Sequence, residues 1–341
     1  MFALLCTVLI FNIREDKLIL TELPTEPLEA WGPARLKLGF IFRGIMLKKP
    51  LEYIDQIKQL KNHGMIILDD DKAKDVLSQI NYYRFTGYAL QFRKGPNVSD
   101  YCTGTTFDNI LNLYHFDEEL RNILRKYIEI AEVYYRTIIS YEFAMSKCVD
   151  DPHDQHYDEN SYFNKNGFNE IKEHFEKEKN YYKDSLIMKH HDKKYNGQMP
   201  LWVMVEMMSM SDVSKLYGCM YISEQKQISS VVKTKTGELR NHLHCLSVLR
   251  NKCAHAARLY NTTFLPSAEL SKNFLTNNKN VKNNTLFAYL IVLVKRLPKE
   301  EMRQQLVKDL EMIVSKYKLS INLQDMGFPN NWSKLLWNQT H

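Results

Sequence analysis

Glycine, proline and paired cysteines are scarce in this chain of 341 residues. It holds 12 glycines and 10 prolines, whereas 44% of its residues are hydrophobic and 25% are charged. This composition excludes a disordered, a collagen-like and a low-complexity chain. No glycine-rich phosphate loop and no G-x-S-x-G nucleophile elbow occurs. The length suits one large domain or two smaller ones with a buried core.

The cysteines form no C-x-x-C pair, and their spacing is wide and irregular. They are Cys6, Cys102, Cys148, Cys219, Cys245 and Cys253. A chain of this size is not a small disulfide scaffold, so we expect reduced, buried thiols in a cytoplasmic protein. The close histidine sets, 153/156, 190/191 and 242/244, lack the cysteines that would complete a zinc pattern. We therefore expect no metal and no cofactor.

Long hydrophobic runs are also absent. Residues 2–13 and 286–294 are the most apolar stretches, and both are shorter than the roughly 18 residues of a membrane span. We expect no contact with a membrane. Residues 1–45 mix apolar and proline-containing segments without periodicity, and Met46 precedes the first regular pattern. We interpret residues 1–45 as a poorly defined extension or a misassigned start, followed by a helical region over 46–100 and a bundle over 101–341.

Helical periodicity dominates from residue 49 onward. Residues 105–151 contain no glycine or proline and carry an apolar seam with alternating steps of four and three, which predicts a long core helix. The seam consists of Leu120, Leu124, Tyr127, Ala131, Tyr134, Ile138 and Tyr141. Residues 201–220 predict one buried, methionine-rich helix that contains Glu206. Strand-like alternation is nearly absent, so we predict an all-α fold.

A charged residue interrupts the apolar stripe of a further predicted helix over residues 239–260. The stripe consists of Leu239, Leu243, Leu246, Arg250, Cys253 and Ala257. A guanidinium at such a position is unfavourable unless it is paired or faces a cleft or a partner. It could pair with a buried acid such as Glu206, or it could face an anion.

Beside this stripe, Asn251, His255 and Arg258 would share one helix face, with His244 two turns earlier. The face carries no carboxylate and would suit an anion. Imidazole and guanidinium groups are what cleavage of an RNA backbone by its own 2′-hydroxyl requires. On a helix, Arg250 and His255 lie about 140° apart, so two copies around a two-fold axis would place both at one phosphate.

The aromatic cluster around Arg84 is a further candidate surface. Tyr82, Tyr83, Phe85 and Tyr88 flank the guanidinium and could stack unpaired bases, or they could pack a small core.

Several segments, in order, resemble Abi-like proteins of the AbiD/AbiF abortive-infection group within the HEPN superfamily. The resemblance spans roughly residues 47–337. Its segments are Lys48-Lys49-Pro50, Ile80 to Tyr88, Phe116 to Arg121, Pro200 to Val203 with Glu206, Leu249 to His255, Arg258 to Asn261, and Met326 to Pro329 with Trp332.

The resemblance implies a HEPN-like helical bundle, a homodimer and a metal-independent endoribonuclease that acts as a toxin in anti-phage defence. Arg250, Asn251 and His255 would be catalytic, and Arg258, His244, Asn261 and Arg84 would bind RNA. A regulatory RNA or an antitoxin protein is a possible further partner. The alternative is a non-catalytic RNA-binding or protein-interaction module that uses the same basic face.

Overall fold

The computed structural model describes residues 10–14, 17–21 and 48–340. The chain divides into two compact units, Met1–Glu52 and Tyr53–His341. In the first unit, β1 (Ile10–Arg14) and β2 (Lys17–Thr21) pair in antiparallel register, with Ile10 opposite Thr21. The other residues of the predicted extension over 1–45 lie outside the described residues.

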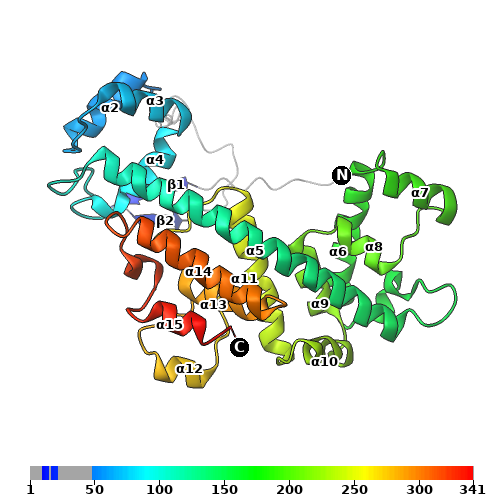
Figure 1. Cartoon of the computed structure of the whole chain (residues 1–341). Helices are drawn as coiled ribbons and strands as arrows, with labels where there is room; N and C mark the ends of the chain where they lie inside the picture. The colour runs from blue at the N-terminus through cyan, green and yellow to red at the C-terminus, as the bar shows by residue number, and fades with distance from the viewer. Residues whose placement is uncertain (1–9, 15–16, 22–47, 341) are drawn as a thin grey trace, which may run out of the picture. The chain divides into compact units, whose positions relative to one another are not determined.

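The second unit is built from helices (Figure 1). They are α2 (Tyr53–Asn62), α3 (Asp70–Gln79), α4 (Tyr82–Ala89), α5 (Phe107–Lys147), α6 (Lys165–Tyr181), α7 (Leu186–Tyr195), α8 (Leu201–Met207), α9 (Met210–Cys219), α10 (Ile222–Val231), α11 (Thr236–Ala254), α12 (Lys272–Asn277), α13 (Leu286–Arg296), α14 (Glu300–Lys316) and α15 (Trp332–Trp337), with short 3₁₀ turns between some of them. Within the described part of this unit, β structure is limited to two isolated bridges. The predicted all-α class is confirmed.

Helix α5 is the long helix that the glycine- and proline-free stretch predicts. It has 41 residues and spans about 60 Å at 1.5 Å per residue. Thr106 caps its N-terminus by accepting a hydrogen bond from the backbone of Asn109. Leu120, Leu124 and Ala131 of its seam are buried, as expected, whereas Tyr141 at the end of the seam is exposed. Helices α4, α8, α10, α11 and α14 all pack on α5, so it is the element against which the others are placed.

Helix α11 lies in the middle of this packing, in contact with α5, α9 and α13. Leu239, Leu243, Leu246 and Cys253 of its predicted stripe are buried. The neighbouring α13 is buried along almost its whole length, which explains its continuous apolar sequence.

Two predicted helices differ in extent from the observed ones. The single helix over 201–220 is wrong, because Met208 is extended and Ser209 caps a new helix by accepting a hydrogen bond from the backbone of Asp212. Glu206 is exposed rather than buried. The helix over 239–260 ends at Ala254, since Ala256 adopts a left-handed conformation with φ 52°. Residues 257–260 therefore leave the helix axis.

None of the helices in the described segments is long and apolar enough to cross a membrane. The described cysteines are all free. Cys219, Cys245 and Cys253 are buried as expected, whereas Cys102 is exposed.

Candidate active site

The last turn of α11 carries the candidate catalytic residues. His255 caps the helix, and its backbone N–H donates to the carbonyl of Asn251 at 3.0 Å. Its side chain is exposed and has no hydrogen-bond or ion-pair partner within the described part of the chain. The imidazole is therefore accessible to a ligand.

Arg250 is held by an acid of α5. Its Nε lies 3.4 Å from Oε2 of Glu132, and the other oxygen of that carboxylate lies 2.6 Å from Nη2 of Arg136. Glu132 thus stands between two guanidinium groups. The sequence pointed instead to Glu206 as a partner of Arg250, but Glu206 lies near Arg136, at 3.7 Å from its Nη1.

The Arg250 side chain remains 37% exposed and lines two cavities. One, of about 470 Å³, is bordered by Arg136, Tyr182 and the residues around Ser209. The other, of about 260 Å³, is bordered by Arg125, Glu129 and Glu132. The guanidinium is therefore paired and also open to a ligand from a concave surface.

Asn251 is fixed from a different side of α11. Its Nδ2 donates to Oγ of Ser211 in α9 at 3.2 Å. This contact orients the amide and ties the last turn of α11 to α9.

Three arginines hold the backbone on the two sides of His255. Arg125 donates to the carbonyl of Cys253 at 3.0 Å, Arg84 to that of Ala256 at 2.5 Å, and Arg121 to that of Ala257 at 3.4 Å. Cations at a helix C-terminus satisfy its free carbonyls and oppose the negative end of its dipole. Arg125 thus holds the last turn of α11, and Arg84 and Arg121 hold the two residues after His255.

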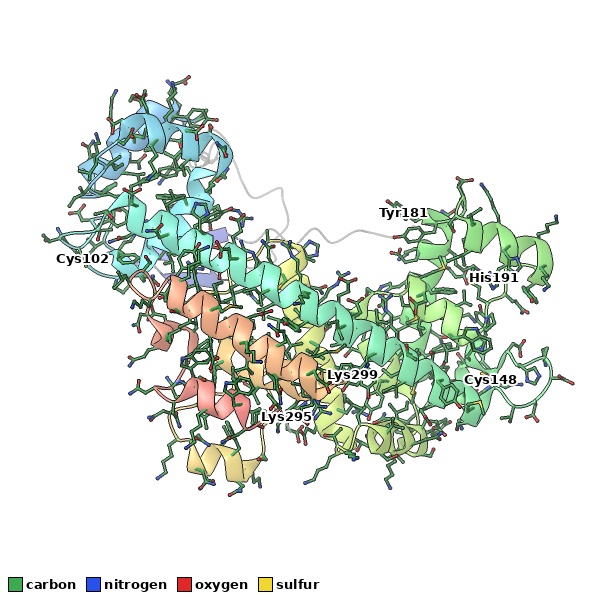
Figure 2. The ribbon with its side chains drawn as sticks, viewed as in Figure 1. Cys102, Cys148, Tyr181, His191, Lys295 and Lys299 are labelled. Carbon is green, nitrogen blue, oxygen red and sulfur yellow. The ribbon has the colours of Figure 1, made fainter. Side chains whose placement is uncertain are left out.

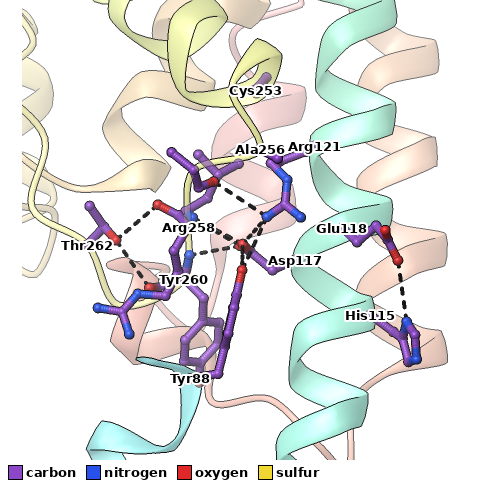
Figure 3. A network of polar contacts seen from close by, with 12 residues as sticks. Tyr88, His115, Asp117, Glu118, Arg121, Cys253, Ala256, Arg258, Tyr260 and Thr262 are labelled. Carbon is purple, nitrogen blue, oxygen red and sulfur yellow. Dashed lines mark hydrogen bonds and ion pairs between the residues drawn. The ribbon is translucent and has the colours of Figure 1, made fainter. Parts of the chain in front are cut away.

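A buried carboxylate anchors the next residues (Figure 3). Asp117 forms an ion pair with Arg121 and accepts hydrogen bonds from the Tyr88 hydroxyl at 2.7 Å and from the Tyr260 backbone at 2.8 Å. Leu259 donates to the same carboxylate at 3.2 Å. Burial raises the pKa of Asp117, and the charge of Arg121 acts against this rise. The group therefore joins α4, α5 and the segment after α11.

Asp117 and Arg121 stand in a segment that resembles the family, but sequence reasoning gave them no role. The signal is their spacing of four residues within the apolar seam of α5, which places opposite charges on one buried face.

The predicted shared face of Asn251, His255 and Arg258 is wrong. The left-handed Ala256 ends α11, and Arg258 turns inward, donates to the carbonyl of Gly87 and lies over the Tyr88 ring, 5.9 Å from its centroid. A residue beyond the helix end no longer follows helical spacing.

The remaining predicted RNA-binding residues have different surroundings. His244 is exposed on α11, about two turns before Asn251. Asn261 is exposed and donates from Nδ2 to Oε1 of Gln91 at 3.3 Å. Arg84 is exposed as well, but its Nη1 atom is engaged by the carbonyl of Ala256.

The aromatic residues around Arg84 divide between core and surface. Phe85 and Tyr88 are buried, whereas Tyr83 is exposed. Within the described residues, no group of three or more His, Cys, Asp or Glu side chains could hold a metal ion.

Comparison with known proteins identifies the family. The model of the family described as Abi-like protein matches residues 75–261. This match covers more than half of the chain and includes Asp117, Arg250 and His255. No curated protein and no solved structure matches the chain. The chain belongs to the Abi-like protein family.

Proposed function

We propose that this chain is a metal-independent endoribonuclease of anti-phage abortive infection, of the AbiD/AbiF type within the HEPN superfamily. The observation that carries the proposal is an exposed imidazole without a protein partner, one turn beyond an arginine that faces two cavities. The family description supports the defence role.

The proposed reaction uses the RNA's own nucleophile. The 2′-oxygen forms a bond to the adjacent phosphorus while the bond from phosphorus to the 5′-oxygen breaks, giving a cyclic phosphate and a free 5′-hydroxyl. The 2′-hydroxyl releases a proton and the leaving oxygen gains one, and His255 takes part in this transfer because imidazole is both acid and base near neutral pH. Arg250 stabilises the negative charge on the phosphate oxygens, with Asn251 as the supporting polar group.

A homodimer is part of the proposal. Arg250 points toward α5 and its cavities, whereas His255 lies in solvent at the helix end. Two copies related by a two-fold axis would contribute both groups to one cleft.

The test is RNA cleavage by the purified chain in EDTA. We expect His255→Ala and Arg250→Ala each to lower the cleavage rate by about 100-fold or more, since both remove groups that act in the transition state. His153→Ala is the matched control, because His153 is also an exposed histidine but lies in another loop. Equal cleavage by His255→Ala and the unchanged chain would refute the role of His255, and no cleavage by the unchanged chain would refute the nuclease.

Growth arrest provides a cellular test. Induced expression of the chain should stop growth of the host, and His255→Ala should restore it at equal protein level. Growth arrest by both the unchanged chain and His255→Ala would show that toxicity does not depend on the proposed chemistry.

A second function is favoured by the Glu132–Arg250 ion pair, which partly neutralises the basic face. A non-catalytic RNA-binding or protein-interaction module would need no free catalytic arginine. In the EDTA assay, RNA binding without cleavage by both the unchanged chain and His255→Ala would support this module.

A further inference from the structure

A cavity of about 850 Å³ lies at the opposite end of α11 from His255. Its wall is formed by the turn between α10 and α11, the end of α13, Arg303 of α14 and the residues after α15. Eighteen residues at 1.5 Å each place it about 27 Å from the catalytic turn along the helix axis. It is therefore a separate site.

The lining of this cavity is strongly cationic. Its charged members are Lys233, Lys235, Lys295, Arg296 and Arg303, with Glu238 as the one acid among the lining residues. Figure 2 labels Lys295, at the end of α13. Like charges gathered in a concave, partly dehydrated space repel one another and raise the local concentration of anions.

Arg296 is the most deeply buried cation of this cluster. The residue is 5% exposed, and its Nε has no hydrogen-bond partner. Its Nη2 lies 3.4 Å from Oγ1 of Thr234 and 3.6 Å from Oε1 of Glu238. A buried guanidinium that a carboxylate at 3.6 Å only partly balances is unfavourable, and an anion in the cavity would add a second counter-charge.

The neighbouring Lys295 also feels the burial and the charges of this cluster. Burial lowers the pKa of Lys295, the charge of Arg296 lowers it further, and Glu238 acts in the opposite direction. One carboxylate therefore lies near a buried guanidinium and a partly buried lysine.

The N-terminus of α11 borders the cavity through Lys235 and Glu238. Lys235 is its N-cap residue, and no side chain accepts a hydrogen bond from the N–H groups of the first turn at the cap. The positive end of the dipole of this 19-residue helix therefore adds to the potential that favours an anion in the cavity.

The size of the cavity and one aromatic wall narrow the ligand class. Small-molecule sites occupy about 300–1,000 Å³, a range that includes this cavity. Tyr134 is partly buried in its wall and presents a ring on which a base can stack.

We propose that this cavity binds a nucleoside di- or triphosphate, with the phosphates on the cationic cluster and the base against Tyr134. This site goes beyond the proposed nuclease. Neither proposal depends on the other, because the cavity and the catalytic turn share no residue.

The test is calorimetric titration of the full chain with ATP, inorganic tripolyphosphate and adenosine, in EDTA at physiological salt. We expect binding of ATP and no binding of adenosine. The double variant Lys233→Gln/Lys235→Gln removes two exposed charges of the cluster and should weaken ATP binding about tenfold. Lys308→Gln/Lys334→Gln, two exposed lysines of α14 and α15, is the matched control and should bind as the unchanged chain does.

Tyr134→Ala distinguishes a nucleotide from a free oligophosphate. We expect it to weaken ATP binding and to leave tripolyphosphate binding unchanged. The proposal is overturned if ATP does not bind, if both double variants bind it equally well, or if tripolyphosphate binds as tightly as ATP and Tyr134→Ala has no effect. His255→Ala should bind ATP as the unchanged chain does, so ATP binding is tested independently of the proposed nuclease activity.

Discussion

At the scale of single residues, Asp117 anchors the segment that follows α11. Its carboxylate forms an ion pair with Arg121 and accepts hydrogen bonds from the Tyr88 hydroxyl and from two backbone N–H groups after α11. Arg121 is itself 2% exposed, so the two charges compensate each other inside the core.

Asp117→Ala leaves the Arg121 guanidinium buried without its carboxylate. We expect a loss of about 3–5 kcal/mol in the free energy of unfolding, which is the usual effect of breaking a buried pair from one side. Urea denaturation followed by circular dichroism measures it. Glu118→Gln, the next residue and half-exposed, is the control and should change stability by less than about 0.5 kcal/mol. Similar losses in both variants would show that Asp117 is no anchor.

At the scale of elements, α5 could be predicted from sequence because nothing interrupts it and its seam keeps one face apolar. The break between α8 and α9 carried a signal as well, since Ser209 and Asp212 have the spacing of a helix cap, but the surrounding methionines favoured a continuous helix. The end of α11 carried no such signal. Residues 255–265 contain no glycine or proline, and the left-handed residue is an alanine. For this reason the helix, and with it the face shared with Arg258, was predicted too long.

The turn after α11 gives a prediction about this helix end. Ala256 has φ 52°, a conformation that disfavours a side chain with Cβ. Ala256→Gly should raise the free energy of unfolding by about 0.5–1 kcal/mol, and Ala256→Val should lower it by more than about 1 kcal/mol. Denaturation midpoints of the three proteins give the order. A glycine variant less stable than the unchanged chain would contradict the left-handed turn.

At the scale of the whole molecule, the helical class and the family could be predicted from sequence, because apolar periodicity and ordered motifs extend over most of the chain. The contacts of the candidate site could not. Which acid meets Arg250, and which carbonyls Arg84 and Arg121 hold, depend on how α4, α5 and α11 cross. Such pairs join residues more than a hundred positions apart, beyond the range of local patterns.

The stability of the whole unit should depend on pH through its buried histidines. His242 donates from Nε2 to the carbonyl of Glu269 at 2.8 Å, and its Nδ1 has no partner. Burial, with the charge of Arg296, lowers its pKa from 6.5 to about 3. Burial also lowers the pKa of His156. At neutral pH the His242 imidazole is therefore uncharged in the folded chain.

The unfolded chain binds more protons than the folded one below about pH 6.5, so stability is complete above that pH and falls as the pH drops toward about 3. We expect His242 to contribute a loss of about 2 kcal/mol between pH 7 and pH 5. Urea denaturation at the two pH values measures it. His242→Gln should show a smaller loss, whereas His153→Gln, in an exposed loop, should behave as the unchanged chain. An unchanged pH dependence in His242→Gln would contradict this assignment.

The ion pair between Glu132 and Arg250 has a consequence for selectivity. The Glu132 carboxylate lies beside the Arg250 guanidinium and repels a phosphate that approaches it. Isolated anions such as chloride or a lone phosphate therefore gain little, while a long polyanion that touches neighbouring cations at the same time can displace the acid. The Glu132–Arg250 pair therefore favours ligands that contact several cations at once.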